Sequence, residues 1–336
     1  MGSVSVIPQY TSSNVPRPIV TVTRRLPETV EARLQQLFDA RTNRDDLPLG
    51  VSGLAAAMTE SDAVLSTLGD PLNAAVLGAL PRRARIIAQF GVGYDNIDVR
   101  AATAAGIIVT NTPGVLTNDT ADLAIMLLLS AARRASEGER ELRRGDWTGW
   151  RPTHNLGTRV TGKRLGIVGF GRIGRAVADR ARLGFRMQVQ AFSRSLTDAA
   201  ARDAGVTRAE NLEALLASSD FVSIHVPSTA ATRQLFGAHL LGLLPPHAVL
   251  VNTSRGDVVD EAALADALQA GRLAAAGLDV FEREPTVSSA LLGLPNAVLL
   301  PHIGSATVEA RTAMGHLAVD NLVAFFEGKT VPNPVA

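Results

Sequence analysis

The segment KRLGIVGFGRIG, Lys163 to Gly174, decides the fold of this chain. An apolar strand pattern leads into the motif GxGxxG, an amphipathic helical pattern follows it, and another strand pattern begins at Gln188. In this context the first glycine permits a tight turn, the second lets a pyrophosphate approach the backbone, and the third lets the helix pack on the strand. The segment therefore predicts a dinucleotide-binding βαβ unit whose helix N-terminus faces the phosphates. The expected contacts are Gly169, Gly171, Arg172, Ile173 and Gly174.

Strand and helix patterns alternate on both sides of this segment. Before it, from Pro18 onward, short β-branched runs alternate with amphipathic segments. One long helix is expected from Asp119 to about Gly145, and a last helix from Ser305 to about Glu327. This alternation predicts an α/β protein with doubly wound parallel sheets that carry helices on both faces. The strands expected from the glycine motif onward are Arg164–Val168, Gln188–Phe192, Phe221–Val226, Ala248–Asn252, Ala275–Asp279 and Ala297–Leu300.

Composition and charge exclude several classes of protein. Hydrophobic residues make up 46% of the chain and the net charge is +1, with no basic run that would indicate a nucleic-acid or membrane partner. Cysteine is absent, which excludes disulfides and thiolate metal sites, and no metal site is predicted. Residues 1–18 lack the features of a signal peptide, and the most apolar run, from Leu123, is too short to span a bilayer. A cytoplasmic protein is therefore expected.

The strand after the glycine motif ends in MQVQAFSRS, Met187 to Ser195. Many dinucleotide-binding units carry an acidic residue at this point, which holds the adenosine ribose. Here Ser193, Arg194 and Ser195 stand in its place. A carboxylate would repel a ribose 2′-phosphate, whereas a guanidinium pairs well with one. We therefore expect NADP(H) to be preferred over NAD(H), with NAD(H) as the second cofactor; the alternative is that Arg194 is an ordinary solvated residue beside the adenine.

Three residues follow the carboxyl ends of three different predicted strands. They are Arg255, Glu284 and His302. Ligands of an open α/β sheet bind outside the carboxyl ends of its strands, so these side chains can converge. Together they suit the reduction of a 2-oxo acid: the arginine holds carboxylate and carbonyl, the histidine delivers a proton as hydride reaches the carbon, and the glutamate orients the histidine. Each residue taken alone is more often solvated or structural, so the joint pattern carries the prediction.

Four blocks of sequence follow one another along the chain: GFGRIG, NTSRGDVVDEAALADAL, AAAGLDVFEREP and LPHIGSAT. Together they resemble the D-isomer-specific 2-hydroxyacid dehydrogenase family, and the likeness extends from about Ile19 over nearly the whole chain. The resemblance implies a Rossmann-type nucleotide domain at residues 113–304, inserted into a flavodoxin-like substrate domain formed by residues 1–112 and 305–336. It also implies that the family's catalytic triad falls on Arg255, Glu284 and His302.

The resemblance implies further contacts, motif by motif. FGVGYDNID resembles the loop whose backbone N–H groups hold the substrate carboxylate, here those of Val92 and Gly93, and Leu68 would form a wall of the pocket. HVPST would cover the adenine, with His225 either beside the cofactor or structural. The remaining implied cofactor contacts are Thr117, Val226, Pro227, Thr253 and Asp279, the last one at the nicotinamide amide.

Within the family, TRRLP and GDWTGWRPTHNLG are most similar to the glyoxylate/hydroxypyruvate reductase branch. In that branch one tryptophan of the second segment reaches the pocket of the partner subunit, and it would be Trp150; alternatively, Trp147 and Trp150 only bury surface in a dimer. The resemblance thus implies a homodimer that reduces small 2-oxo acids, glyoxylate to glycolate and hydroxypyruvate to D-glycerate. The alternatives are a dehydrogenase for another substrate, such as phosphoglycerate or D-lactate, and a non-enzymatic nucleotide-sensing scaffold.

Overall fold

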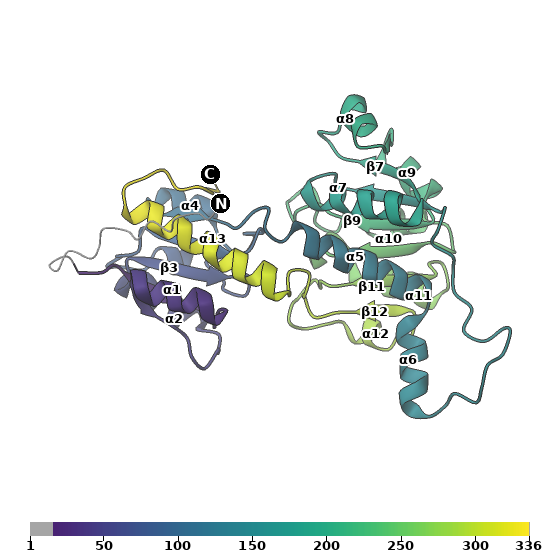
Figure 1. Cartoon of the computed structure of the whole chain (residues 1–336), viewed down its shortest axis with the longest axis horizontal. Coiled ribbons are helices and arrows are strands. Elements are labelled where there is room, and N and C mark those ends of the chain that lie inside the picture. Colours follow the sequence, from purple (N-terminus) through teal and green to yellow (C-terminus); the bar gives the residue numbers. More distant parts are fainter. Residues whose placement is uncertain (1–15, 336) are drawn as a thin grey trace, which may run out of the picture. The chain divides into compact units, whose positions relative to one another are not determined.

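Residues 16–335 are described by the computed structural model, and they form two compact units (Figure 1). One unit ends at Leu116 and resumes at Ala306, and the other runs from Thr117 to Ser305. The expectation about residues 1–18 falls almost wholly outside the described part of the chain. Within that part, none of the helices combines the length and the apolar character that a membrane crossing requires.

The first unit is built on a five-stranded parallel sheet in the order β2-β1-β3-β4-β5. The helices α2, α3 and α4 share an apolar core with the sheet, whereas α13 packs on β4 and on α1. This strand order is the flavodoxin-like one. The strands are β1 (Ile19–Val22), β2 (Asp39–Arg41), β3 (Ala63–Thr67), β4 (Ile86–Phe90) and β5 (Ile108–Thr110). The helices are α1 (Glu28–Leu37), α2 (Gly50–Glu60), α3 (Ala74–Leu77), α4 (Val99–Ala104) and α13 (Val308–Phe326).

The second unit is built on a seven-stranded parallel sheet in the order β12-β11-β10-β9-β6-β7-β8. This is the Rossmann strand order, extended by one strand beyond β11. The direction of winding reverses between β6 and β9, and ligands of such sheets bind at this switch point. The strands are β6 (Arg164–Val168), β7 (Gln188–Phe192), β8 (Thr207–Arg208), β9 (Phe221–Ile224), β10 (Val249–Asn252), β11 (Ala275–Leu278) and β12 (Ala297–Leu299).

Helices cover both faces of this second sheet. Alternate residues of β10 show this, because Val249 and Val251 lie in an apolar core with α5 and α7, and Leu250 lies in another with α9, α10 and α11. The predicted fold class, two doubly wound parallel-sheet domains, is confirmed. The helices are α5 (Thr117–Ala132), α6 (Ala135–Arg144), α7 (Arg172–Asp179), α8 (Asp198–Asp203), α9 (Leu212–Ser218), α10 (Ala238–Gly242), α11 (Glu261–Gln269) and α12 (Ser289–Leu292), with a π-helical turn at Arg180–Gly184 and a 3-10 turn at Gly256–Val258.

The single helix expected from Asp119 to about Gly145 is wrong, because the chain forms two helices there, α5 and α6. Between them Arg134 adopts a left-handed backbone conformation with φ of 53°, which few residues other than glycine adopt. Its guanidinium is held by Glu137 through two hydrogen bonds of 3.0 and 2.6 Å. The two-residue edge strand β8 was not predicted. The last helix begins at Val308, because the Thr307 side chain caps it.

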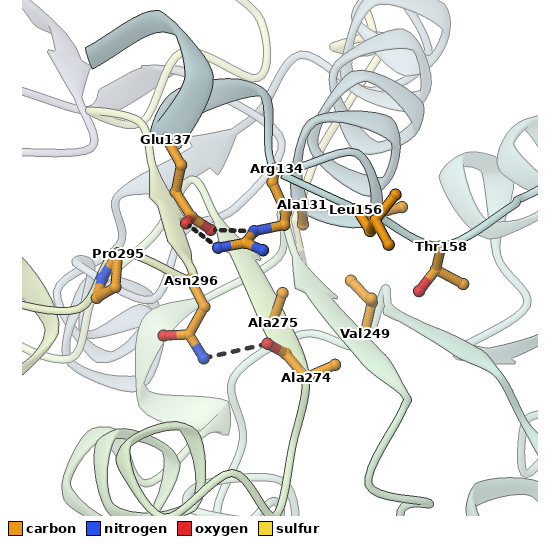
Figure 2. Close-up of a pocket in the computed structure, with 12 residues that line it drawn as sticks. Ala131, Arg134, Glu137, Leu156, Thr158, Val249, Ala274, Ala275, Pro295 and Asn296 are labelled. Carbon is orange, nitrogen blue, oxygen red and sulfur yellow. Dashed lines mark hydrogen bonds and ion pairs between the residues drawn. The ribbon is translucent and has the colours of Figure 1, made fainter. Parts of the chain in front are cut away.

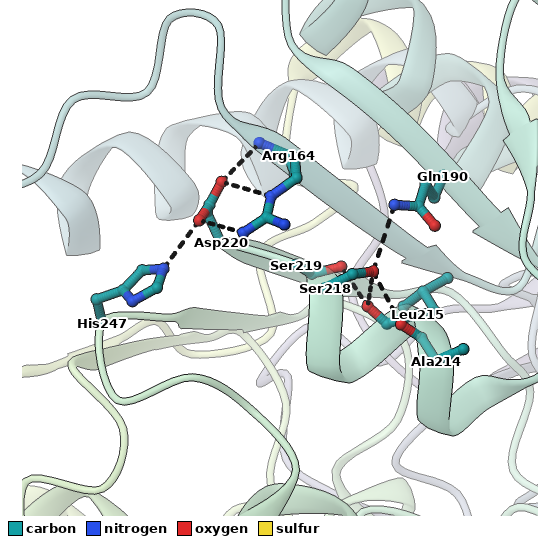
Figure 3. A network of polar contacts seen from close by, with 8 residues as sticks. All are labelled: Arg164, Gln190, Ala214, Leu215, Ser218, Ser219, Asp220 and His247. Atoms are coloured by element: carbon teal, nitrogen blue, oxygen red, sulfur yellow. Dashed lines mark hydrogen bonds and ion pairs between the residues drawn. The ribbon is translucent and has the colours of Figure 1, made fainter.

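A polar network fixes the amino ends of the central strands (Figure 3). Asp220, which precedes β9, accepts hydrogen bonds from the backbone N–H of Arg164 at 2.9 Å and from Nε2 of His247 at 2.8 Å. The Arg164 guanidinium adds bonds of 3.3 and 3.2 Å. Burial alone would raise the pKa of Asp220, but these donors hold it well below its usual range. The network therefore holds β6 and β9 together at their amino ends. The glycine loop, residues 169–174, lies at the opposite, carboxyl end of β6.

Candidate active site

Glu284 and His302 form a hydrogen-bonded pair in the second unit. His302 Nδ1 lies 2.7 Å from Glu284 Oε2, and Glu284 Oε1 accepts the backbone N–H of Phe281 at 3.0 Å. Burial alone would raise the pKa of Glu284, but the hydrogen bond from His302 and the nearby charge of Arg255 lower it below its usual value. An ionised carboxylate only accepts, so Nδ1 carries the proton in this bond and Nε2 is left for a ligand. The structure thus brings Glu284, His302 and the charge of Arg255 together.

The turn that carries Arg255 is shaped by two neighbours which sequence reasoning did not select. Buried Asn252 donates from Nδ2 to the carbonyl of Arg255 at 2.8 Å and accepts the N–H of Ser254 at 3.0 Å. A Cβ at Gly256 would lie 1.9 Å from the carbonyl carbon of Phe281, so only glycine permits this approach. The Arg255 turn therefore packs directly on the backbone that leads to Glu284. The one sequence signal was the glycine immediately after Arg255.

His302 is presented by a turn that Asp279 holds. His302 has a φ of 53°, and its backbone N–H donates to the carbonyl of Asp279 at 2.9 Å. The Asp279 carboxylate accepts the next two backbone N–H groups, those of Ile303 at 2.8 Å and Gly304 at 2.7 Å. Burial raises the pKa of Asp279, and these two bonds oppose that shift. Each oxygen keeps a further lone pair that could accept a nicotinamide amide N–H. That contact stays a prediction.

The glycine loop fits a dinucleotide. A Cβ at Gly169, where φ is 94°, would lie 2.4 Å from the carbonyl oxygen of His225, and a Cβ at Gly174 would lie 2.2 Å from that of Gly169. At Gly171, in contrast, a Cβ would meet no atom of the described residues within 4 Å. Within residues 16–335 no side-chain hydrogen bond caps the N-terminus of α7, so the amide groups of its first turn, from Arg172 and Ile173 onward, are open to an anion. The loop is closed on the protein side and open where a pyrophosphate needs room.

Two further positions fit a ligand at this edge of the sheet. Thr253 follows β10 and is buried, and its hydroxyl has no hydrogen-bond partner among residues 16–335. Such an orphaned hydroxyl is a feature that a bound ligand would explain. Ser193, Arg194 and Ser195 form a turn after β7, which the N–H of Leu196 closes by donating to Ser193 at 3.1 Å. Arg194 is exposed and pairs with no carboxylate in the described range.

The segment after β9 is divided between structural and exposed residues. His225 Nε2 lies 2.8 Å from Ser223 Oγ, and the N–H of His225 donates to Val168 at 2.7 Å. Burial lowers the pKa of His225 to about 4, so the ring is neutral near pH 7. These contacts favour the structural alternative for His225. Val226 is half-buried and Pro227 exposed, across the switch point from the glycine loop.

The predicted substrate contacts lie in the first unit. Leu68 follows β3, and Val92 and Gly93 follow β4. Asn96 links the two loops, because its Nδ2 donates to the carbonyl of Thr67 at 3.0 Å while its Oδ1 accepts from Gln89 at 2.8 Å. The backbone N–H groups of Val92 and Gly93 make no hydrogen bond within the described residues. They are therefore available to a ligand. Sequence reasoning missed Asn96, although it lies inside the quoted motif.

The remaining predicted residues lie at the start and in the periphery of the second unit. Thr117 is the first residue of α5 and is half-buried. Trp150 lies in the loop after α6, and its side chain is 82% exposed.

A separate pocket opens at the opposite edge of the second sheet (Figure 2). It encloses about 290 Å³ and is lined by Val249 and Ala275, which begin β10 and β11, and by the Arg134–Glu137 ion pair. None of the predicted site residues lines it. Since ligands of open α/β sheets bind at the carboxyl ends of the strands, this pocket is not the candidate active site.

Comparisons with known proteins agree with this geometry. The family model described as D-isomer specific 2-hydroxyacid dehydrogenase, NAD binding domain, matches residues 125–304. A glyoxylate reductase from Thermococcus litoralis is 46% identical over 325 residues, which are 95% of this chain and 97% of that protein. The crystal structure of an NADPH-dependent glyoxylate/hydroxypyruvate reductase from Sinorhizobium meliloti, in complex with NADP and malonate, is 39% identical with a TM-score of 0.84, and the match covers 95% of this chain and 97% of that chain. The holo form of Rhodotorula graminis D-mandelate dehydrogenase is 30% identical with a TM-score of 0.85, and the match covers 96% of this chain and 98% of that one.

Proposed function

The chain belongs to the D-isomer specific 2-hydroxyacid dehydrogenase family of NAD(P)-dependent oxidoreductases, and from that premise we propose that it reduces glyoxylate and hydroxypyruvate with NADPH. The observation that carries the reaction type is the 2.7 Å bond between His302 Nδ1 and Glu284 Oε2, beside the charge of Arg255. The choice of substrates is supported by the likeness to glyoxylate reductases at 46% identity.

The chemistry assigns a separate task to each side chain. When bound, the reduced cofactor supplies a hydride to the carbonyl carbon of the substrate. His302 donates the proton on Nε2 to the carbonyl oxygen, and the ring is left as the neutral Nδ1–H tautomer bonded to Glu284. Glu284 stays ionised throughout, because its pKa lies below the usual value. Arg255 holds the carboxylate and polarises the carbonyl by charge-assisted hydrogen bonds.

We assign the second unit, Thr117 to Ser305, as the nucleotide domain and the other unit as the substrate domain. The open space at Gly171 and the uncapped start of α7 would receive the pyrophosphate. The hydroxyl of Thr253 would face the cofactor, and the backbone N–H groups of Val92 and Gly93 would bind the substrate carboxylate, because none of these groups has a hydrogen-bond partner among residues 16–335. The further cofactor contacts in this proposal are Thr117, Val226, Pro227 and Asp279.

NADPH is the proposed cofactor because of the turn after β7. Arg194 is exposed and has no acidic partner among residues 16–335, so its guanidinium is available to a 2′-phosphate. Ser193 and Ser195 would add neutral hydroxyl donors without the repulsion that a carboxylate would bring. NADH lacks the 2′-phosphate and would use the same pocket with lower affinity.

We also infer that the active protein is a homodimer that associates through α6 and the loop after it. Large apolar side chains are exposed there, among them Trp147 and Trp150, and exposed apolar surface of this kind marks interfaces. Trp150 would then reach the substrate pocket of the second copy. Light scattering should give twice the mass of one chain, and a monomer that is fully active would contradict this inference.

A panel of 2-oxo acids tests the proposed function. Glyoxylate, hydroxypyruvate, pyruvate and 3-phosphohydroxypyruvate would each be assayed with NADPH and with NADH, by following oxidation of the cofactor. We expect the highest kcat/KM for the first two acids with NADPH. Faster turnover of pyruvate or of the phosphorylated acid would overturn the substrate assignment. Turnover no higher than that of the His302→Ala protein with every acid would overturn the enzymatic function itself.

A further inference from the structure

Glu261 is the first residue of α11, and its carboxylate is buried. The residue is 8% exposed, and burial raises its pKa, although backbone N–H groups of Glu282 and Ser288 oppose the shift. The side chain is not needed to cap the helix, because Asp260 Oδ1 already accepts the N–H of Ala263 at 3.0 Å. Burying a carboxylate costs free energy unless specific bonds compensate for it. The group that Glu261 binds therefore indicates why the carboxylate is buried.

That partner belongs to the turn which carries Glu284. Glu261 Oε1 accepts the backbone N–H of Glu282 at 2.6 Å. Glu282 directly follows Phe281, whose own N–H donates to Glu284 Oε1 at 3.0 Å. Glu261 therefore bonds to the backbone inside the short turn that sets the direction of the Glu284 side chain.

The same turn contacts the Arg255 segment at a second point. Gly256 packs so closely on the backbone of Phe281 that a Cβ added to Gly256 would lie 1.9 Å from the Phe281 carbonyl carbon. Gly256 and Glu261 belong to one continuous segment that begins after Arg255 and enters α11. Two contacts thus hold the segment with Arg255 and the turn with Glu284 in one relative position. A displacement of the turn would first weaken the 2.7 Å bond between Glu284 and His302, because hydrogen bonds depend steeply on distance and angle.

We propose that Glu261 is a positioning residue for the reduction: its buried carboxylate fixes the turn at 281–284, so that Glu284 meets His302 and the charge of Arg255. The inference rests on the proposed function, since it takes His302 as the proton donor. Glu261 touches neither substrate nor cofactor in this scheme and acts only through Glu284.

Three substitutions at this position separate reach, charge and hydrogen bonding. Glu261→Gln keeps the length and an acceptor oxygen for the N–H of Glu282. Glu261→Asp keeps the charge but is shorter by one methylene, and Glu261→Ala leaves that N–H unpaired. We expect kcat for glyoxylate reduction to stay within about threefold for the glutamine variant and to fall about tenfold for the other two, the loss expected when a buried N–H loses its partner. The affinity for NADPH, measured by fluorescence, should change less than about twofold, since no cofactor contact is altered.

The pH dependence provides a readout that a purely structural role would not change. Glu261→Asp and Glu261→Ala should move the base-side limb of kcat/KM to lower pH, in the same direction as Glu284→Gln. Introduced into the Glu284→Gln protein, Glu261→Ala should move that limb no further, because both changes act through one interaction. An NMR titration of the His302 ring, assigned with a His302→Gln protein, measures the same effect without substrate. Glu282→Gln is the matched control, because it alters the neighbouring side chain and keeps the backbone N–H that Glu261 binds.

The outcomes are distinguishable. Lower thermal stability of Glu261→Ala with wild-type kcat per folded molecule and a wild-type His302 titration would overturn the proposal. A normal aspartate variant beside an impaired glutamine variant would also overturn it, since charge rather than reach would then matter. If the alanine variant does not fold, the aspartate and glutamine pair decides alone. If the wild-type protein reduces no 2-oxo acid, the proposed function fails, and the His302 titration still decides the role of Glu261.

Discussion

Replacing Gly256 with alanine tests how closely the Arg255 turn must approach the turn that bears Glu284. The added Cβ would lie 1.9, 2.1 and 2.4 Å from the carbonyl carbon, oxygen and Cα of Phe281. Ordinary contacts begin near 3.4 Å, and all three atoms are backbone, so one of the two turns must move by more than about 1 Å. Overpacking of this kind costs about 1–3 kcal/mol, which lowers the melting temperature of a domain of this size by about 2–12 °C. A displacement of about 1 Å between reacting groups can reduce kcat/KM by about 100-fold.

The assay combines steady-state reduction of glyoxylate with thermal unfolding of the same preparation. Gly242→Ala is the matched control, because Gly242 lies in the same unit, at the end of α10. A Cβ there would meet no described atom within 4 Å, and helix propensity favours alanine over glycine. We expect the control to keep its activity and to be as stable as the wild type or slightly more stable. If Gly256→Ala kept both its melting temperature and its kcat/KM, the inferred contact between the two turns would be refuted.

The remaining predictions concern four charged or titratable side chains. His302→Ala should lower kcat by about 100-fold or more, and near-normal turnover would remove it from the role of proton donor. Glu284→Gln should move the base-side limb of kcat/KM toward acid pH, because the ring loses an ionised partner at 2.7 Å; an unchanged pH profile would contradict this. Arg194→Ala should raise KM for NADPH and leave KM for NADH nearly unchanged, whereas equal losses would indicate a general effect on the fold. Asp220→Asn should destabilise the protein by about 1–3 kcal/mol near pH 7, since it leaves Arg164 without its buried partner. The folded pKa of Asp220 lies below its unfolded value, so its contribution is complete above about pH 5 and is lost as the pH falls further; denaturant unfolding near pH 7 and pH 3 should show the difference shrinking.

The fold could be predicted from the sequence because local and global signals agree. Each central strand is apolar on both faces, and the glycine motif marks the point at which β6 passes into α7. The break between α5 and α6 was not predictable in this way, because the left-handed residue is Arg134 and neither glycine nor proline marks the position. The strand β8 has only two residues, which is too short for a periodic pattern.

The residues of the candidate site also fall into those that the sequence could indicate and those that it could not. Arg255, Glu284 and His302 could be selected because each follows the carboxyl end of a strand, a position that the topology makes functional. Gly256 and Glu261 could not be selected, because their importance depends on contacts with a turn that lies some twenty residues away or more in the chain. In the sequence alone, Glu261 is an ordinary acidic residue in the first turn of a helix.

The left-handed conformation of His302 favours a small set of amino acids at that position. Asparagine, aspartate, histidine and glycine tolerate such a backbone, whereas valine, isoleucine and threonine do so at a considerable cost. A saturation library selected only for folding should therefore be enriched in asparagine and glycine at position 302, even though neither can donate the proton. Of the side chains that the backbone accepts readily, histidine alone titrates near neutral pH. A β-branched residue at this position would first require a different turn.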